Sequence, residues 1–247
     1  MKLNRVPRVF VGTMFSGEAE FDLCCESVAN QSGVKVTHHI ISHMAEMEAH
    51  NELWLSWGKV KSEYDFFAKI DADTVLINEY ALENVWNLFS QNSRVTGAQI
   101  LLHDYFTDKL IAGLNFFSPK VEFNCSTNRL LPDRVDKNHD IILKGDEVAH
   151  LSPIGWHCKA PNPKQAFHFG LHRALKRQDD VIESLSRAWL IYRDDARAWA
   201  ISGALAANFW MRKNFDYDNK GFSLAFEKWN KYPDRLNKVM TFAKSFG

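Results

Sequence analysis

Two aspartates, Asp71 and Asp73, stand one residue apart at the end of an apolar run, within FFAKIDADTVL at residues 66–76. Because successive residues of a strand point to opposite faces, this spacing predicts that both carboxylates project to one side, together with Lys69. Two carboxylates so close raise each other's pKa unless a cation lies with them. Mg²⁺ and Mn²⁺ prefer oxygen ligands and commonly join protein carboxylates to phosphate oxygens. The pattern therefore favours a divalent-metal site; the alternative is a solvated turn that begins at Asp73 and Thr74.

The segments before these aspartates alternate between strand-like and helical patterns. The predicted elements are strands at residues 8–15, 34–42 and 64–70 and helices at residues 18–30 and 45–60. This order, with its short connections, predicts a parallel sheet with right-handed crossovers. Ligands of such sheets bind beyond the carboxyl ends of the strands, which is where Asp71 and Asp73 lie.

The rest of the chain extends this sheet and then becomes helical. A helix is predicted at residues 82–91 and a pair of strands within residues 95–118, whereas residues 119–150 have a loop-like composition. The predicted fold class is α/β: a Rossmann-like mixed, mainly parallel sheet flanked by helices, with a C-terminal α-helical extension. The predicted division places an α/β domain, which carries Asp71 and Asp73, at residues 1–177 and the helical extension at residues 178–247.

The bulk composition indicates a folded chain without a dominant charge. Hydrophobic residues make up 46% of 247 residues, which supports a real core, and 30 lysines and arginines balance 30 aspartates and glutamates. This balance disfavours a polyanion-binding arm. The four cysteines show no CxxC spacing, as expected of free thiols in a reducing compartment. No signal peptide or membrane span is predicted, so we expect a cytoplasmic location.

The first strand-to-helix turn, GTMFSGEA at residues 12–19, is a poor site for a pyrophosphate. The GxxxxGK[ST] pattern would need Lys and then Ser or Thr where Glu18 and Ala19 stand, and no GxGxxG occurs. Glu18 would repel an anion. The turn could instead line a base or ribose pocket, through Thr13, Phe15 and Ser16.

The stretch after Asn162 predicts a helix over residues 163–177, because Asn162 suits the N-cap and Pro163 the first helical position. The residues expected to be buried are Phe167, Leu171, Ala174 and Leu175. Spacing by four places a second set on another face: Lys164, His168, His172 and Lys176. The lysines disfavour a zinc site at the two histidines. This second face is therefore predicted to be solvated or to face an anion, with Arg173 or Lys176 as a diphosphate contact.

Four segments together resemble the GT-A glycosyltransferases, specifically the family-two-like branch. They are RVFVGTMF, VKVTHHIIS, FFAKIDADTVL and the later GWHCKAPNPKQAFHFGLHRALK. The DxD motif of that family matches Asp71 and Asp73, and its late metal-binding histidine matches His157. The resemblance covers about residues 7–177. It implies a GT-A fold and the transfer of a hexosyl or pentosyl group from a nucleotide diphosphate sugar to an acceptor hydroxyl.

The resemblance also implies roles for individual residues. Mn²⁺ or Mg²⁺ held by Asp73 and His157 would stabilise the diphosphate leaving group, while Asp71 would orient a water on the metal or the ribose. An inverting transfer needs a carboxylate base, which the resemblance places at Asp133 or, less favoured, Asp136; a turn or cap acid is the alternative for Asp133. The predicted metal ligands are Asp71, Asp73 and His157, and the predicted donor-binding residues are Thr13, Phe15, Ser16, Lys69, Asp71, Arg173 and Lys176.

Two other classes of function remain open from the sequence. DADTVL also satisfies the DxDx[TV]L pattern of haloacid-dehalogenase-like phosphatases, in which Asp71 would be the nucleophile and Asp73 the acid. Those enzymes usually carry the motif on the first strand, whereas two strand–helix units precede it here. The other class is a noncatalytic nucleotide-sugar-binding module whose helical tail is a partner surface.

For a glycosyltransferase, the expected acceptor is a surface glycan, a lipid-linked precursor or a hydroxylated DNA base. The balanced charge mildly disfavours DNA. The helical tail would cover the acceptor site or form a homodimer.

Overall fold

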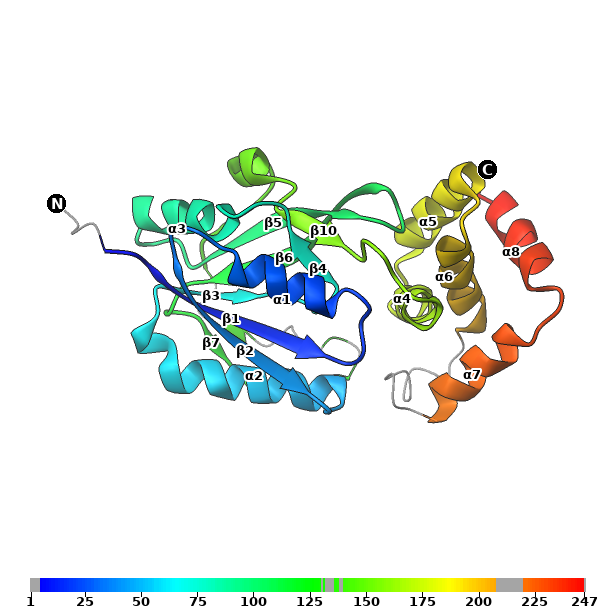
Figure 1. Cartoon of the computed structure of the whole chain (residues 1–247), viewed down its shortest axis with the longest axis horizontal. Coiled ribbons are helices and arrows are strands. Elements are labelled where there is room, and N and C mark those ends of the chain that lie inside the picture. The colour runs from blue at the N-terminus through cyan, green and yellow to red at the C-terminus, as the bar shows by residue number, and fades with distance from the viewer. Residues whose placement is uncertain (1–4, 130, 132–135, 138–139, 208–219, 247) are drawn as a thin grey trace. The chain divides into compact units, whose positions relative to one another are not determined.

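The computed structural model describes residues 5–129, 131, 136–137, 140–207 and 220–246, which are drawn in colour in Figure 1. Its contacts divide the chain into two compact units, each considered by itself below. Unit 1 comprises Met1–His103 and Leu110–Lys159, and unit 2 comprises Asp104–Lys109 and Ala160–Gly247. The sequence suggested a boundary at residue 177, whereas the contacts group the helix that begins at Pro163 with unit 2.

Unit 1 is built on a mixed sheet flanked by helices. Its strands are β1 (Arg8–Phe15), β2 (Lys35–Ser42), β3 (Phe66–Lys69), β4 (Thr74–Leu76), β5 (Gly97–Asp104), β6 (Lys109–Phe117), β7 (Glu122–Phe123), β8 (Asp136–Lys137), β9 (Ile142–Leu143) and β10 (Gly155–His157). Its helical segments are α1 (Phe21–Ala29), α2 (Glu46–Val60), η1 (Lys61–Glu63), α3 (Ala81–Gln91) and η2 (Gly145–Leu151).

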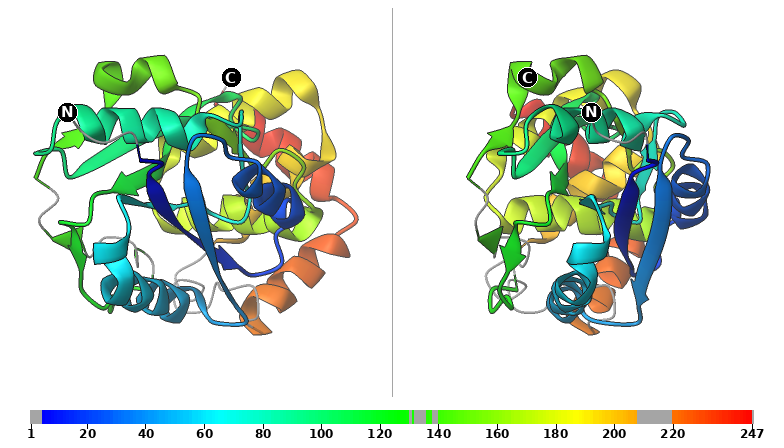
Figure 2. Two further views of the ribbon diagram at one scale, coloured as in Figure 1. Left: turned by 60° about the vertical axis from the view of Figure 1, so that its left-hand side comes forward. Right: turned by 90° about the vertical axis from the view of Figure 1, so that its left-hand side faces the viewer.

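The order of strands in the main sheet is β2-β1-β3-β6-β5-β10-β4, with β9 paired to β5. β1 lies parallel to both β2 and β3, and Figure 2 shows β1 and β2 running side by side. β9 is parallel to β5, whereas β6 runs antiparallel to β3 and β10 runs antiparallel to β4. The predicted α/β class, with its parallel β2-β1-β3 core, is confirmed. Residues 119–150, predicted as loop, contribute the short elements β7, β8, β9 and η2.

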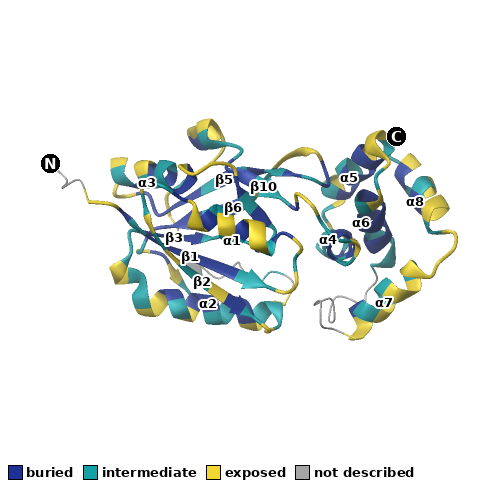
Figure 3. Cartoon of the chain, in the orientation of Figure 1, coloured by how far each residue is buried: buried dark blue, intermediate teal, exposed yellow. Residues whose placement is uncertain are grey.

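Two hydrophobic cores hold this sheet, one on each face, because side chains alternate along the strands. Val9 and Val11 of β1 pack with α1 and α3 on one face. Phe10 of β1 and Phe67 of β3 pack with α2 on the other face, against Trp57 at centroid distances of 5.7 and 5.1 Å. Figure 3 shows the buried residues along β1 between these helices. β3 is thus buried on both faces, and Asp71 and Asp73 follow soon after its last residue, Lys69.

Unit 2 is helical. Its helices are α4 (Pro163–Leu175), α5 (Asp179–Tyr192), α6 (Asp195–Ala206), α7 (Lys220–Asn230) and α8 (Arg235–Lys244). The predicted cap of α4 is confirmed, because the Asn162 side chain accepts a hydrogen bond of 2.9 Å from the Gln165 amide and Pro163 opens the helix. Of its predicted buried residues, Phe167, Leu171 and Leu175 are buried. Among the described residues, every helix is too short or too polar to cross a bilayer.

The turn at residues 104–109 belongs to unit 2 because Arg197 of α6 holds it. The Arg197 guanidinium donates from Nε to the Phe106 carbonyl at 3.0 Å and also donates to the Tyr105 carbonyl. Its third hydrogen bond runs from Arg197 Nη1 to Asp194 Oδ2 at 2.7 Å. The Asp194 side chain also caps α6, because it accepts a hydrogen bond from the Arg197 amide. These charge-assisted hydrogen bonds give the buried guanidinium of Arg197 its polar partners.

Two sequence-based expectations for unit 2 need amendment. The face of α4 that carries His168 and His172 is not solvated: both rings are partly buried, and Phe222 of α7 packs against His168 at 5.4 Å. Burial holds the pKa of His172 well below its usual range, with Lys176 adding to the effect. The sequence also favours a packing role for the four tryptophans of the C-terminal helices: Trp189, Trp199, Trp210 and Trp229. Trp189 and Trp199 are core residues, whereas Trp229 lines a surface hollow of about 570 Å³ and Trp210 lies outside the described residues.

The helices α4 and α6 meet at two glycines. A Cβ at Gly170 would lie 1.7 Å from the Ala200 carbonyl oxygen, and one at Gly203 would lie 1.9 Å from the Phe167 carbonyl oxygen. Neither obstacle is a flexible side chain. The backbones of the two helices therefore touch only because both positions lack a side chain.

We predict that Gly203→Ala lowers the free energy of unfolding by about 1–3 kcal/mol or more, because the two helices must separate to admit the methyl group. The matched control is Gly58→Ala in α2, where a Cβ meets nothing within 4 Å. That control should raise the free energy of unfolding by about 0.5–1 kcal/mol, since alanine is the better helix former. Chemical denaturation of both variants measures the difference; equal effects would contradict the close packing.

Candidate metal centre

The end of β3 is followed by a turn that carries both aspartates. β3 ends at Lys69, and the Thr74 amide donates to the Asp71 carbonyl at 2.9 Å, which closes a turn over residues 71–74. Asp71 and Asp73 therefore lie in a turn after β3 and not on the strand itself, so the alternation of strand side chains does not set the direction of their carboxylates. The turn leads into β4 and lies at the carboxyl end of β3, one of the parallel strands.

β10 brings the late histidine to this turn. In the antiparallel pair of β4 and β10, His157 is the partner of Thr74, the residue that follows Asp73. The backbone contact continues one residue further, because the Cys158 amide donates to the Asp73 carbonyl at 2.9 Å. Residues more than 80 positions apart in the chain are thus held together by regular strand pairing.

Asp73, His157 and Cys158 form a compact triad of potential metal ligands. Asp73 Oδ2 lies 3.5 Å from His157 Nε2 and 3.2 Å from Cys158 Sγ, which donates to it. Cys158 Sγ lies 3.5 Å from His157 Nε2. The side chains of Asp73 and His157 are 19% and 12% exposed, and Cys158 is buried. The sequence predicted the first two members at this site but missed the third.

The surroundings of the Asp73 carboxylate favour the binding of a cation. In the described part of the chain, its Oδ1 atom is buried and accepts no hydrogen bond. A buried carboxylate oxygen without a partner is costly, and a bound metal ion is one of the few groups that could satisfy it. Oxygen and imidazole nitrogen are both ordinary ligands of divalent ions. The residues present therefore fit the predicted metal.

Asp71 pairs with Lys69, as their predicted proximity suggested. Lys69 Nζ lies 2.5 Å from Asp71 Oδ1, and 47% of the Asp71 side chain is exposed. Burial of the carboxyl would raise its pKa, but the charge and hydrogen bond of Lys69 outweigh this effect and lower the pKa of Asp71. Asp71 is therefore an anion at the rim of the site, next to the triad rather than within it.

Glu18 is a third acid of this region. Its Oε2 accepts a hydrogen bond of 2.7 Å from the Ser16 amide. Burial raises the pKa of Glu18 to about 7 despite that bond, and the negative charges of Asp73 and Asp71 add to the effect. The sequence identified Glu18 only as a residue that would repel phosphate. Its proximity to the aspartates depends on the path of the loop after β1, which the pattern of residues does not determine.

The other residues of the first turn are placed as follows. Thr13 is fully buried, with Oγ1 2.9 Å from His38 Nε2. Phe15 is partly exposed and stacks on Phe21 at a centroid distance of 4.0 Å, and Ser16 is exposed. Phe15 and Ser16 are thus accessible, whereas the Thr13 side chain is engaged with β2.

The remaining predicted site residues lie elsewhere in the chain. Arg173 belongs to unit 2, where it donates to Gln178 at 2.9 Å and lies over the Phe169 ring at 4.9 Å. Lys176 caps the C-terminal end of α4 in the same unit. Asp133 lies outside the described residues, and Asp136 is described only by its backbone in β8. Their roles in donor binding and proton transfer stay predictions.

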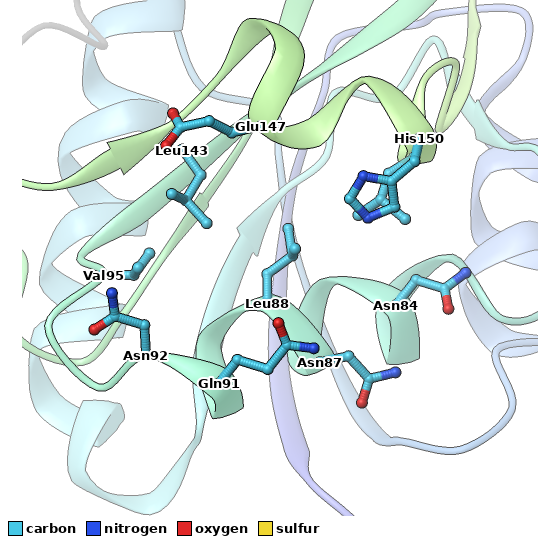
Figure 4. A pocket seen from close by; sticks show the side chains of 10 residues that line it. Asn84, Asn87, Leu88, Gln91, Asn92, Val95, Leu143, Glu147 and His150 are labelled. Carbon is cyan, nitrogen blue, oxygen red and sulfur yellow. The ribbon is translucent and has the colours of Figure 1, made fainter.

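Another hollow of unit 1 lies between α3 and η2 and has a volume of about 390 Å³. Figure 4 shows Asn84, Asn87 and Gln91 of α3 along one side and Glu147 and His150 of η2 along the other. None of the residues that line it was predicted as a site residue, and none belongs to the triad.

Comparison with known proteins gives distant structural likenesses. No family model matches the sequence, and no curated protein matches it. The mannosyltransferase PcManGT from Pyrobaculum calidifontis, in complex with GDP-Man and Mn²⁺, is 10% identical with a TM-score of 0.42, over 98% of this chain and 85% of that chain. A197 from STIV is 14% identical with a TM-score of 0.35, over 45% of this chain and 64% of that chain.

A glycosyltransferase involved in the glycosylation of the major capsid of PBCV-1 is 11% identical with a TM-score of 0.29, over 45% of this chain and 60% of that chain. The matches to the PBCV-1 glycosyltransferase and to A197 thus span less than two thirds of those two chains. Likenesses this distant do not transfer an activity or a ligand to the present chain.

We predict that Glu18 makes the metal-free protein less stable as the pH rises. Because the folded pKa of about 7 lies above the ordinary value of 4.5, the folded state retains a proton that the unfolded state releases. This contribution to stability is complete below pH 4.5 and is lost as the pH rises to about 7. In Glu18→Gln the loss is absent, so the melting temperature of the variant relative to wild type should increase between pH 5 and pH 8.

The control for this prediction is Glu26→Gln on the exposed face of α1. Its melting temperature should follow that of wild type across the same range, measured in the presence of a chelator. Parallel curves for wild type and Glu18→Gln would show that Glu18 is an ordinary surface acid.

Proposed function

We propose that this chain is a metal-dependent glycosyltransferase of the GT-A type, which moves a sugar from a nucleotide diphosphate sugar to an acceptor hydroxyl. The observation that carries the proposal is the pairing of Asp73 with His157, with a buried carboxylate oxygen that accepts no hydrogen bond in the described part of the chain. These are the two residues that match the metal-binding positions of the family that the sequence resembles.

In this proposal, Asp73 and His157 would hold Mn²⁺ or Mg²⁺ at the carboxyl end of the parallel strands. The bound ion would offset the negative charge that develops on the diphosphate leaving group. Asp71, which Lys69 keeps ionised, would orient the ribose of the donor. Phe15 and Ser16 would line the nucleotide pocket, as accessible groups on the neighbouring turn.

Proton transfer and further contacts of the diphosphate fall to other residues. Deprotonation of the acceptor hydroxyl requires a carboxylate, for which Asp133 and then Asp136 are the candidates. Arg173 and Lys176 are candidate contacts of the diphosphate. The proposed acceptor is a surface glycan, a lipid-linked precursor or a hydroxylated DNA base. The four free cysteines support a reducing location such as the cytoplasm. The helical tail at residues 178–247 is a candidate region for contact in a homodimer.

The phosphatase hypothesis has less support from the geometry of the turn. Such an enzyme would need Asp71 and Asp73 to face one phosphoryl group as nucleophile and acid. Here Asp73 instead faces His157 and Cys158, while Asp71 faces Lys69. The motif also follows the third strand in the chain rather than the first.

We predict that one nucleoside diphosphate raises the melting temperature only when Mn²⁺ is present. A thermal-shift panel of nucleoside diphosphates, with and without the ion, measures this effect. At a ligand concentration 100 times Kd, the expected stabilisation is about 2.7 kcal/mol. The stabilisation should vanish in Asp73→Ala and persist in Asp22→Ala, an exposed acid in the first turn of α1.

Assays with labelled donors separate the classes of function. A transferase releases a nucleoside diphosphate, whereas a phosphatase releases inorganic phosphate from phosphomonoesters. Stabilisation of the protein by a nucleoside diphosphate without metal would refute the proposed role of the triad. Stabilisation that persists in Asp73→Ala would refute it as well. Retained nucleotide binding with no turnover of any donor would favour a noncatalytic binding module.

A further inference from the structure

We propose that Cys158 is a third protein ligand of the metal, so that the centre prefers a thiophilic divalent ion over Mg²⁺. The ligand set would be the Asp73 carboxylate, His157 Nε2 and Cys158 Sγ, which offer oxygen, nitrogen and sulfur. This inference rests on the proposed function only in placing a metal at this turn. It adds a ligand and an ion preference that the DxD motif and the late histidine do not imply.

The dimensions of the triad match one face of a tetrahedral site. Zinc–ligand distances of about 2.3 Å to sulfur and about 2.0–2.1 Å to nitrogen and oxygen give ligand–ligand separations of roughly 3.3–3.6 Å at tetrahedral angles. The three separations here are 3.2 Å for sulfur to oxygen and 3.5 Å for the other two pairs. The ligands would need to move by only a few tenths of an ångström to receive an ion.

The backbone at Cys158 is shaped to bring its sulfur to this position. Neighbouring residues of a strand point to opposite faces, so a regular continuation of β10 would turn Cys158 away from His157. Instead Cys158 adopts a φ of +54°, in the left-handed region that is uncommon for residues other than glycine. The Cys158 amide is held by the Asp73 carbonyl at 2.9 Å, and the two side chains converge on one carboxylate.

This conformation costs free energy that packing must offset. Strained backbone of this kind persists where the surrounding structure holds it, and it concentrates at binding and catalytic sites. At Cys158 this conformation places the sulfur beside Asp73 and His157, so the backbone and the ligand distances belong to one arrangement.

The triad leaves room for a substrate. Three protein ligands and an open fourth position are the usual arrangement of catalytic zinc-type sites. Asp73 and His157 retain 19% and 12% exposure, whereas Cys158 is buried behind them. A phosphate oxygen of the donor would therefore approach from the side of the carboxylate and the imidazole.

The sulfur decides which ions the site accepts. On ligation the thiol proton passes to solvent, and the thiolate forms the bond to the metal. Thiolate is a soft ligand that favours zinc and its transition-metal neighbours, whereas Mg²⁺ takes hard oxygen ligands in octahedral geometry. The order of affinity should accordingly be Zn²⁺ and Co²⁺ above Mn²⁺, with Mg²⁺ the weakest.

Titration of the metal-free full-length protein with Co²⁺ tests the inference without any measurement of activity. A thiolate ligand gives an intense sulfur-to-cobalt charge-transfer absorption in the near ultraviolet, which oxygen and nitrogen ligands do not give. We expect this band in wild type at one equivalent of Co²⁺. It should be absent from Cys158→Ser and unchanged in Cys125→Ser, which removes an exposed thiol that lies outside the triad.

Calorimetric titrations complete the test. We expect Cys158→Ser to weaken Zn²⁺ binding by at least about 10-fold to 100-fold, because the loss of a group that only supports a metal ligand already has an effect of this size, while Mg²⁺ binding changes little. The absorption spectrum of wild type with Co²⁺ tests for a thiolate ligand even if the variant folds poorly. Co²⁺ bound without the charge-transfer band would overturn the role of Cys158 and leave the proposed function standing. Absence of any metal binding would overturn both.

Discussion

The carboxylate of Asp73 is the group on which the site depends. It is held between an imidazole and a thiol, and one of its oxygens is buried without a hydrogen bond in the described part of the chain. A charge in such a place is expensive unless an opposite charge joins it. The hydrogen bond from the Cys158 thiol and the neighbouring His157 do not supply a fixed positive charge. A divalent cation would supply one.

The fold makes this arrangement from two kinds of strand pairing. The parallel strands β2, β1 and β3 are buried between helices on both faces and deliver residues 71–74 to one edge of the unit. The antiparallel pair of β4 and β10 then sets His157 and Cys158 beside that turn. Lys69 and Glu18 complete the surroundings, one as the partner of Asp71 and the other as an acid with a raised pKa. The site thus draws on segments from the beginning, middle and end of unit 1.

Much of this could be predicted from local patterns. The strands at residues 8–15 and 34–42 and the cap at Asn162 follow from the alternation of side chains and from capping chemistry, which act over a few residues. Lys69 beside Asp71 follows from the same short range. The sequence offered a turn that begins at Asp73 and Thr74 only as the alternative, because an apolar run that ends in DAD fits a continued strand equally well. The partial burial of His168 on α4 was missed because its contact, Phe222 of α7, comes more than 40 residues later in the chain.

Cys158 shows most clearly what a pattern cannot supply. Its neighbour His157 was found by resemblance to a family, but the cysteine gives no signal of its own in GWHC. Its contribution arises from a left-handed backbone and from the pairing of β10 with β4, both of which are set by contacts across about 80 residues of sequence. Adjacency to a predicted metal-binding histidine was the one available hint.

The most direct test is an anomalous difference map from a crystal of the full-length protein grown with Mn²⁺ and a nucleoside diphosphate. The account predicts one strong peak within bonding distance of Asp73 and His157, with the nucleotide's phosphate oxygens on its open side. Bound nucleotide with no peak at that turn, and the Asp73 carboxylate still facing only the Cys158 thiol and the His157 ring, would contradict it.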